Sequence, residues 1–305
     1  MKKLTHLTPN STIGIIAPAS SDDIETMNIN IEKFKHLGFN IELSKHLFYK
    51  EKYLSASDKD RASDLMDFFQ DPNVDAILCY RGGFGSIRML PYLDFKIIKK
   101  NPKIFCGYSD ITALLNTINK NCNFATFHGP MVNSNFSDVD TYEEFLNVLS
   151  LGNSGYYYNL DKFQCSYINK KNFSGKLVGG NLTLICSLMG TDYEIDTKNN
   201  IVLIEEINES PYVVDRMLSQ LIESKKLTSA SAIILGHFTD CNPQSVEKSY
   251  TISELIVYKL ASLNIPIVYN FPSGHSYPNI VLPIGVELNF NSSTNRLIIS
   301  NDLFK

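Results

Sequence analysis

The segment that most strongly suggests chemistry is Gly107-Tyr108-Ser109-Asp110, which joins an apolar run to a helical pattern. The apolar run is Lys103–Cys106, and the helix is predicted over Ile111–Asn119. A serine at such a junction lies over the unpaired N–H groups of the first helical turn, where negative charge is favoured. A serine nucleophile needs that environment when it turns a carbonyl oxygen into an oxyanion. The alternative is that Ser109 only caps the helix.

Directly after the serine comes Asp110, which has two possible uses. Its side chain can cap the start of the helix or complement the helix dipole. Its backbone N–H is placed to donate to an oxyanion. The sequence around Ser109 lacks the GxSxG elbow of the α/β-hydrolases, which disfavours that class.

A glycine-rich loop, Tyr80-Arg81-Gly82-Gly83-Phe84-Gly85-Ser86, follows another predicted strand and precedes another predicted helix. Consecutive glycines let backbone N–H groups approach a ligand without a Cβ in the way. The loop is compatible with a cradle for an anion or oxyanion, with a tight turn, or with a nucleotide phosphate loop. Its glycines do not fit the GxGxxG or GxxxxGK[ST] spacings, so nucleotide binding has little support.

Two carboxylates, Glu205 and Glu206, end an apolar run that begins at Ile201. A carboxylate at the end of an apolar strand is costly unless it has a partner. Glu209 and Asp215 lie near or in the start of a predicted helix, where acidic residues are common. A purely structural role therefore fits Glu206 and Glu209 better than Glu205.

A general base would have to come from the six histidines of the chain. His6, His36 and His46 lie in polar surroundings. The other three are His128 and His237, which follow apolar runs, and His275, in the loop between two predicted strands. Catalytic groups are often carried by loops on a rigid frame, but spacing alone does not choose among these three.

The elements that must position these residues alternate between strand and helix in the first half of the chain. Strands are predicted over Thr12–Ala17, Phe39–Leu43, Val74–Tyr80, Lys103–Cys106 and Phe124–His128, and helices over Ile24–Leu37, Asp58–Gln70, Ser86–Tyr92 and Ile111–Asn119. Such alternation indicates an α/β fold with a parallel sheet covered on both faces. Ligands bind at the carboxyl ends of the strands in these sheets, where Gly82 and Ser109 both fall.

The pattern changes after about residue 150. Residues 151–173 are rich in Asn, Gly, Ser, Lys and Tyr and are predicted to connect an N-terminal domain, 1–150, with a C-terminal domain, 174–305. The second domain is expected to have strands over Ile201–Glu205, Ala230–Gly236, Ile265–Phe271, Val286–Phe290 and Arg296–Ser300, and helices over Asn181–Met189, Tyr212–Ser224 and Ile252–Leu263. No internal repeat is present in the sequence.

Bulk properties exclude several classes of function. The net charge of −4 and the scattered Lys and Arg residues give no support to a nucleic-acid partner. No apolar run reaches the length of a membrane span, so no membrane association is expected. Residues 4–12 are broken by His6 and Pro9, which argues against a signal peptide and for a cytoplasmic protein.

The six cysteines show neither a CxxC pair nor a metal-ligand spacing. Cys79, Cys106 and Cys186 lie inside apolar segments, as buried free thiols in a reducing compartment do. The sequence therefore predicts neither a disulfide framework nor a metal site, and no cofactor is expected.

Taken in order, the motifs resemble the serine LD-carboxypeptidase family, which also includes the microcin-immunity peptidases. The resemblance spans residues 14–285, and its matching segments are Gly14–Ser20, Arg81–Gly85, Gly107–Thr112, Phe127–Pro130, Gly179–Leu182, Ile204–Glu209 with Pro211-Tyr212 and Asp215–Leu218, Gly236-His237 and Gly274-His275.

The resemblance implies a serine peptidase with a Ser-Glu-His triad. Ser109 would be the nucleophile, His275 the general base and Glu205 the residue that orients the imidazole. The oxyanion hole would consist of the backbone N–H groups of Gly83 and Asp110, with Gly82 the weaker alternative to Gly83. The family fold has a Rossmann-like N-terminal domain and a smaller, β-rich C-terminal domain, and usually forms a homodimer. The site is therefore expected between the two domains.

The substrates of this family are murein tetrapeptides, from which a terminal D-alanine is removed. A carboxypeptidase has to bind a free carboxylate, so a cation is expected at the site. Arg81 is the nearest candidate, together with its neighbour Gly82, and Arg88 or Arg216 are alternatives. For each arginine a structural ion pair is an equally good explanation.

Two other functions stay open at the level of sequence. The microcin-immunity branch cleaves peptidyl-nucleotide antibiotics with the same triad, and its members tend to be longer and to stack an aromatic residue, often Trp, on the base. This chain has no Trp, which favours murein peptides. A non-catalytic protein that holds an anion at helix N-termini is the third possibility, although it would give Glu205 and His275 no purpose.

Overall fold

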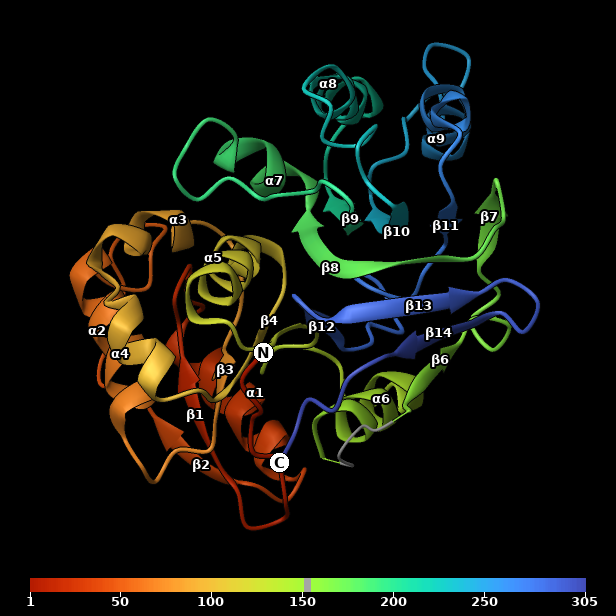
Figure 1. The fold of residues 1–305 in the computed structure, drawn as a ribbon. Helices are drawn as coiled ribbons and strands as arrows, with labels where there is room; N and C mark the ends of the chain where they lie inside the picture. The colour runs from red at the N-terminus through yellow and green to blue at the C-terminus, as the bar shows by residue number, and fades with distance from the viewer. Residues whose placement is uncertain (151–154) are drawn as a thin grey trace. The chain divides into compact units, whose positions relative to one another are not determined.

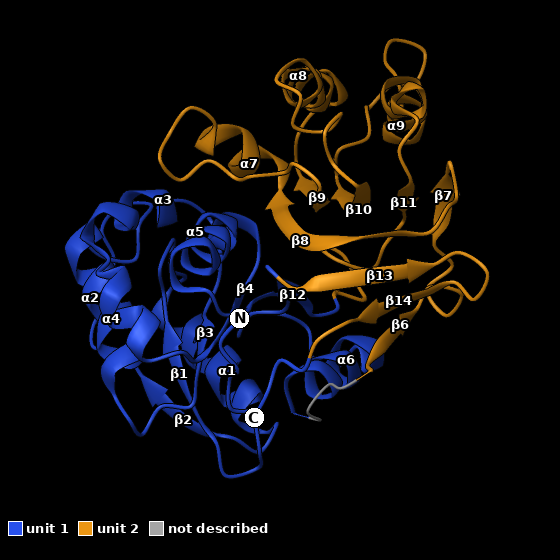
Figure 2. Ribbon diagram, viewed as in Figure 1, with its two compact units in different colours: residues 1–153, 280–285, 302–305 blue, residues 154–279, 286–301 orange. Residues whose placement is uncertain are grey.

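The computed structural model describes residues 1–150 and 155–305, and it divides into two compact units (Figure 2). Unit 1 comprises residues 1–153, 280–285 and 302–305. Unit 2 comprises residues 154–279 and 286–301. No helix among the described residues is both long enough and apolar enough to cross a bilayer.

A six-stranded sheet forms the centre of unit 1 (Figure 1). Its order is β12-β5-β4-β3-β1-β2, with bounds Leu282–Ile284, Thr126–His128, Ile104–Gly107, Ala76–Cys79, Thr12–Ile16 and Asn40–Leu43. Neighbouring strands from β2 to β5 are parallel, and β12 runs antiparallel to β5. Every residue of β3 and β4 is buried, which explains why both read as continuous apolar runs.

The helices of unit 1 cover both faces of this sheet. They are α1 (Ile24–Lys35), α2 (Asp58–Gln70), α3 (Ser86–Met89), α4 (Phe95–Lys100), α5 (Thr112–Cys122) and α6 (Val139–Ser150), with 3-10 turns at Leu90–Tyr92 and Ser109–Ile111. The crossover from β1 to β2 runs opposite to those from β3 to β5, so right-handed connections put α1 on the other face from α2 to α5. Phe145 of α6 packs edge-on against Phe34 of α1, which places α6 with α1.

The strand order of unit 1 reverses between β1 and β3. Such a reversal is a topological switch point, and in open parallel sheets ligands bind beside it at the carboxyl ends of the strands. The glycine-rich loop follows β3 and the Ser109 turn follows β4. The sheet therefore brings both predicted motifs to this edge.

Unit 2 is built on an eight-stranded sheet of order β6-β14-β13-β8-β9-β10-β11-β7. Strands β8 (Phe173–Asn181), β9 (Ile201–Ile207), β10 (Ala232–Thr239) and β11 (Ile267–Tyr269) are parallel and are connected through α7 (Leu182–Leu188), α8 (Pro211–Glu223) and α9 (Ile252–Leu260), the last followed by a 3-10 turn at Ala261–Leu263. Figure 1 shows these three helices on one side of the sheet. Antiparallel pairing adds β6 (Tyr157–Asn159), β7 (Ser166–Ile168), β13 (Glu287–Asn291) and β14 (Arg296–Ile299).

The structure confirms the predicted fold class, an α/β protein with a parallel N-terminal sheet and a second, β-rich part. Every predicted strand and helix is present, with ends displaced by a few residues. The sequence pattern did not predict α4 and α6, or the strands β6, β7, β8 and β12.

Residues 155–173 do not form the plain connection that was predicted, because they contain β6, β7 and the start of β8. These short strands pair at the two ends of the sheet of unit 2, with β14 and β11, and three residues are too few to show a clear alternation of burial. The remainder of the predicted connection, residues 151–154, lies outside the described residues. Residues 280–285 and 302–305 belong to unit 1 and not to a C-terminal domain, because β12 pairs with β5 and Leu4 pairs with Phe304.

Candidate active site

Ser109 opens a 3-10 turn directly after β4, and its φ is +64°. This left-handed conformation costs a residue with a Cβ about 1–2 kcal/mol. Strain of this kind persists where the surrounding structure imposes it, and it is concentrated at functional sites. A sharp strand-to-helix turn around a serine is also the geometry of a nucleophile elbow, although the GxSxG signature is missing here.

The glycine-rich loop lies against the side chain of Ser109. A Cβ added to Gly82 would lie 2.9 Å from the Oγ of Ser109 and 3.5 Å from the backbone nitrogen of Asp110. Gly83 has a φ of +123°, and a Cβ there would lie 2.3 Å from the Oγ of Ser20. Both positions therefore require glycine. The backbone N–H groups of Gly83 and Asp110 donate to no described residue.

Asp110 is almost fully buried, at 2 % exposure. The sequence suggested that its carboxylate could cap the helix that it begins. The structure shows no such cap among the described residues. Instead the carboxylate accepts a hydrogen bond from the backbone N–H of Ser86, at the start of α3, over 2.8 Å. Burial raises the pKa of the Asp110 carboxyl, and the hydrogen bonds from Ser86 oppose that rise.

Arg61 supports the same loop from α2. Its side chain is buried and donates to the carbonyl oxygens of Pro18 at 2.5 Å and Gly85 at 2.9 Å. It also pairs with Asp58, while burial lowers the pKa of the guanidinium. A buried cation whose donors are held by backbone carbonyls fixes the loops that carry those carbonyls.

Of the three candidate cations for a substrate carboxylate, two are held in ion pairs. Arg81 pairs with Asp22, which also accepts from the Tyr80 hydroxyl at 2.9 Å. Arg88 pairs with Asp58 at 2.9 Å. Arg216 lies exposed on α8. The structural explanation considered for Arg81 and Arg88 therefore has direct support.

Unit 2 brings Glu205 and His275 together. The Nδ1 of His275 lies 2.6 Å from the Oε2 of Glu205, whose side chain is fully buried, while the His275 side chain is 13 % exposed. A carboxylate only accepts, so Nδ1 carries the proton, and Nε2 is then the basic nitrogen of the ring. Two glycines make the approach possible, because a Cβ on Gly274 or Gly236 would lie 2.9 or 3.2 Å from the Cβ of Glu205.

Glu206, next to Glu205, has a different environment. Its carboxylate accepts from the backbone N–H of Thr183 at 2.9 Å, from the Thr183 hydroxyl at 2.8 Å and from the Asn181 amide at 2.9 Å. These donors lie at the start of α7, where a negative charge is stabilised by the helix dipole. Successive side chains of β9 point to opposite faces of the sheet. Glu206 therefore lies at a helix N-terminus, and Glu205 lies beside the imidazole of His275.

The other two histidines that follow apolar runs lie elsewhere. His128 is buried in β5 of unit 1 and packs against Tyr108. His237 is in β10 of unit 2, where its backbone N–H donates to the carbonyl of Ser273 and its Nε2 lies 3.0 Å from the carbonyl of Pro278. Burial lowers the pKa of His237, which keeps its ring neutral. His237 therefore supports the loop that carries His275.

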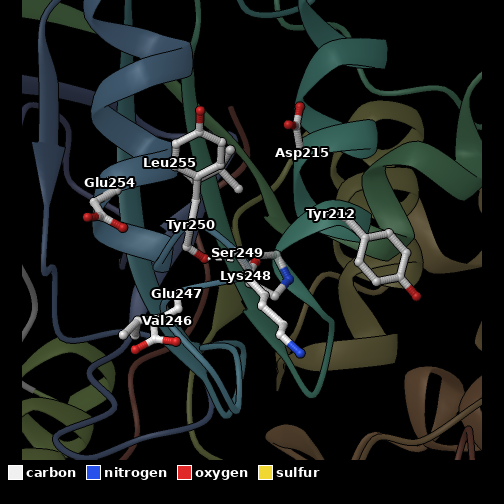
Figure 3. A pocket seen from close by; sticks show the side chains of 10 residues that line it. Tyr212, Asp215, Val246, Glu247, Lys248, Ser249, Tyr250, Glu254 and Leu255 are labelled. Atoms are coloured by element: carbon white, nitrogen blue, oxygen red, sulfur yellow. Dashed lines mark hydrogen bonds between the residues drawn. The ribbon is translucent and has the colours of Figure 1, made fainter.

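A separate cavity of about 610 Å³ lies in unit 2 between the starts of α8 and α9 and the loop at residues 246–250 (Figure 3). Its walls include Tyr212, Lys248 and Tyr250, and they include neither Glu205 nor His275. The side chains drawn in Figure 3 come from several elements and do not converge on one point. No motif in the sequence predicted this cavity.

Comparison with known proteins defines the class. The sequence-family model of the LD-carboxypeptidase N-terminal domain matches residues 13–129. The family model of the LD-carboxypeptidase C-terminal domain matches residues 174–290. The chain therefore belongs to the LD-carboxypeptidase family.

Individual relatives cover nearly the whole chain. A probable murein peptide carboxypeptidase of Bacillus subtilis is 36 % identical, over 96 % of this chain and 92 % of the relative. Among solved structures, MccF in complex with glutamyl sulfamoyl guanosine superposes with a TM-score of 0.91 at 26 % identity, covering 99 % of both chains. A muramoyltetrapeptide carboxypeptidase from Oxalobacter formigenes gives a TM-score of 0.83 at 28 % identity, covering 96 % of this chain and 99 % of the other.

Three residues that hold the site were not found from sequence: Ser20, Arg61 and Ser86. Ser20 ends one matching motif and Ser86 directly follows another, at positions where polar residues are expected to form turns. Arg61 lies in the middle of a predicted amphipathic helix, where arginine is ordinarily solvated. Nothing in the pattern of α2 indicates that this arginine is buried.

Proposed function

We propose that this protein is a serine LD-carboxypeptidase that removes the terminal D-alanine from murein tetrapeptides, cleaving the bond after an L-configured centre. The observation that carries the proposal is the 2.6 Å hydrogen bond between His275 and the buried carboxylate of Glu205. It is supported by the strained backbone of Ser109 and by membership of the LD-carboxypeptidase family.

In the proposed mechanism Ser109 is the nucleophile. Its oxygen attacks the carbonyl carbon of the terminal peptide bond while His275 Nε2 takes the hydroxyl proton. His275 then donates this proton to the nitrogen of the departing D-alanine. A water molecule attacks the acyl-enzyme, again with His275 as base, and the Ser109 hydroxyl is restored. Glu205 fixes the tautomer of the imidazole and stabilises its charged form.

The oxyanion of each tetrahedral intermediate would be held by the backbone N–H groups of Gly83 and Asp110. Their lack of an acceptor among the described residues supports this role. Losing one donor of this kind costs about 2.7–4 kcal/mol of barrier. Gly82 is the weaker candidate because its contacts with Ser109 make it chiefly a site of close approach.

The substrate carboxylate needs a cation. Arg81, with Gly82 beside it, is the proposed binding site for that carboxylate. The side chain of Arg81 is one-third exposed although it pairs with Asp22. Arg216 is the alternative, since it is exposed and no ion pair of it with a described residue is present. We further propose a cytoplasmic protein without nucleic-acid or membrane partners, on the ground of its composition, and a homodimer, on the ground of the family resemblance.

Ser109→Ala provides the direct test. We expect the variant to fold normally and to lose hydrolysis of a murein tetrapeptide, because alanine lacks the nucleophile. Mass spectrometry of the peptide should show loss of one alanine with the unaltered protein and no change with the variant. Ser137→Ala, at an exposed serine of unit 1, is the matched control and should keep full activity. Hydrolysis by Ser109→Ala at the unaltered rate would contradict the proposal.

The same assay separates the alternative functions. The names of relatives include MccF, so a peptidyl nucleotide analogue should be offered beside the murein tetrapeptide. Faster cleavage of the nucleotide conjugate would replace the murein proposal by the microcin-immunity one. A serine-directed phosphonate provides the second comparison, since a protein that only binds an anion should form no covalent adduct at Ser109.

A further inference from the structure

Two hydrogen bonds join the end of the glycine-rich loop to the turn that carries Ser109. The backbone N–H of Ser86 donates to the Oδ2 of Asp110 at 2.8 Å, and the Ser86 hydroxyl donates to the backbone carbonyl of Asp110 at 2.5 Å. Ser86 is fully buried and Asp110 nearly so. We call this the Ser86–Asp110 pair. Because both of its bonds lie away from water, it is a rigid link between the two motifs.

Further contacts hold residues 82–85 of the glycine-rich loop. The backbone N–H of Ser20 donates to the Gly82 carbonyl at 3.4 Å, and the N–H of Phe84 donates to the Ser20 hydroxyl at 3.3 Å. Arg61 holds the Gly85 carbonyl at 2.9 Å. These contacts tie the loop to the segment after β1 and to α2. The Ser86–Asp110 pair ties the end of the loop to the turn after β4.

The geometry of Asp110 is not that of an ordinary capping residue. A capping carboxylate accepts from the N–H groups of its own helix, two or three residues ahead. Asp110 instead accepts from Ser86 N, in a separate element. Meanwhile its own N–H has no acceptor among the described residues. The carboxylate of Asp110 therefore holds Ser86, while its backbone N–H is left available for a ligand.

We propose that Ser86 and Asp110 are positioning residues, whose paired hydrogen bonds set the distance between the backbone N–H groups of Gly83 and Asp110. This inference rests on the proposed function, because it gives those two N–H groups an oxyanion to hold. A tetrahedral oxygen requires donors at fixed separation, and misplacing one by about 1 Å can cost about 100-fold in rate.

Asp110→Ala tests the pair in the full-length protein. The substitution removes the carboxylate and leaves the backbone N–H of residue 110 in the chain. We expect kcat for the tetrapeptide to fall about 10- to 100-fold while KM changes less than about twofold, because the loss falls on the transition state. The affinity for a peptide boronic acid, which forms a tetrahedral adduct on Ser109, should fall by the same factor as kcat.

Asp110→Asn is the conservative variant. Its amide oxygen can still accept from Ser86 N, so it should recover most of the kcat and boronate affinity that Asp110→Ala loses. A merely structural role would not produce this matched recovery. Ser86→Ala removes only the hydroxyl bond to the Asp110 carbonyl, keeps the side chain small, and should give a smaller loss of the same kind.

Asp94→Ala is the matched control. Asp94 is an exposed aspartate of unit 1 that caps α4 by accepting from Lys96 N at 2.8 Å. Its loss should lower the melting temperature but leave kcat and boronate affinity unchanged. Should Asp110→Ala fail to fold, Ser86→Ala and Asp110→Asn carry the same comparison.

The results that would overturn the inference differ from those that would overturn the proposed function. Unchanged kcat and boronate affinity in the folded variants would remove the positioning role, as would a loss that only follows the unfolded fraction or that appears in KM alone. The proposed function itself would fail if the unaltered protein neither hydrolysed the tetrapeptide nor formed a boronate adduct at Ser109.

Discussion

At the scale of single residues, the sharpest contrast lies between Glu205 and Glu206, two adjacent acids with the same formal charge. Both are buried, and each is stabilised by different donors. Glu206 accepts from the backbone and side chain of Thr183, whereas Glu205 accepts from His275. The Oε1 of Glu205 has no hydrogen bond to any described residue, so its environment stabilises the charge poorly except through the imidazole.

Glu205→Gln is expected to lower kcat about 1,000- to 10,000-fold, by analogy with amide substitution of the carboxylate in a Ser-His-Asp triad. The amide can no longer stabilise the imidazolium, and it can donate to Nδ1 and so favour the wrong tautomer. Hydrolysis of the tetrapeptide under single-turnover conditions measures the effect.

Glu206→Gln is the control for that substitution. It should cost about 1 kcal/mol of unfolding free energy, since it weakens charge-assisted bonds to Thr183, and should leave kcat nearly unchanged. If the two variants had equal kcat values, the assignment of Glu205 to the triad would be wrong.

The sequence predicted Glu205 as the residue without an ordinary structural role, and it predicted that Gly82 and Ser109 lie at the same edge of the sheet. Both inferences rested on residues whose local pattern is unusual. Arg61 and Ser86 could not be found in this way, because their local patterns are ordinary. Their partners, the carbonyl of Gly85 and the carboxylate of Asp110, come from other elements and become neighbours only in the fold.

At the scale of elements, β10 carries the irregularity on which the position of His275 depends. Its register with β9 shifts between Leu235 and Phe238, so a bulge falls at Gly236-His237. The backbone N–H of His237 turns from the ladder to the carbonyl of Ser273 at 2.8 Å. A Cβ on Gly236 would lie only 2.3 Å from that same carbonyl oxygen. The bulge thus holds the beginning of the His275 loop by a backbone contact that only glycine permits.

Gly236→Ala should therefore push the loop at residues 272–279 away from Glu205. We expect kcat to fall at least about 10-fold, because the imidazole loses its alignment, and the protein to lose about 1–3 kcal/mol of stability through overpacking. Kinetics and a urea titration measure the two effects separately.

Gly38→Ala is the control, since Gly38 has a φ of +93° and a Cβ there would meet nothing within 4 Å. It should cost about 1 kcal/mol through backbone strain and leave kcat unchanged. Full activity in Gly236→Ala would show that the bulge does not position the base.

At the scale of the whole molecule, the chain does not divide into two consecutive domains. It leaves unit 1, builds most of unit 2, and returns to unit 1 for β12 before its last strands. Sequence alone did not predict the return, because the apolar run at residues 280–284 is short, contains Pro283 and can be placed in either sheet. Pro283 is tolerated because β12 is an edge strand, where a missing N–H faces no partner strand.

The return of the chain predicts that residues 1–153 do not form a stable protein alone. Without β12, strand β5 becomes an exposed edge, and a completely buried apolar set formed by Val281, Leu282 and Ile284 is lost. Each of these side chains contributes about 1.5–3 kcal/mol, against a total stability of about 5–15 kcal/mol for an ordinary domain.

We expect the fragment to be largely insoluble or to melt well below a second fragment, in which residues 280–285 follow residue 153 through a flexible Gly-Ser linker. Soluble yield and circular-dichroism melting measure the difference. The matched control carries Leu282→Ser and Ile284→Ser in the linked fragment, which keeps the length and linker but removes the apolar burial, and it should behave like residues 1–153. Equal melting temperatures for all three fragments would show that unit 1 is complete without the returning strand.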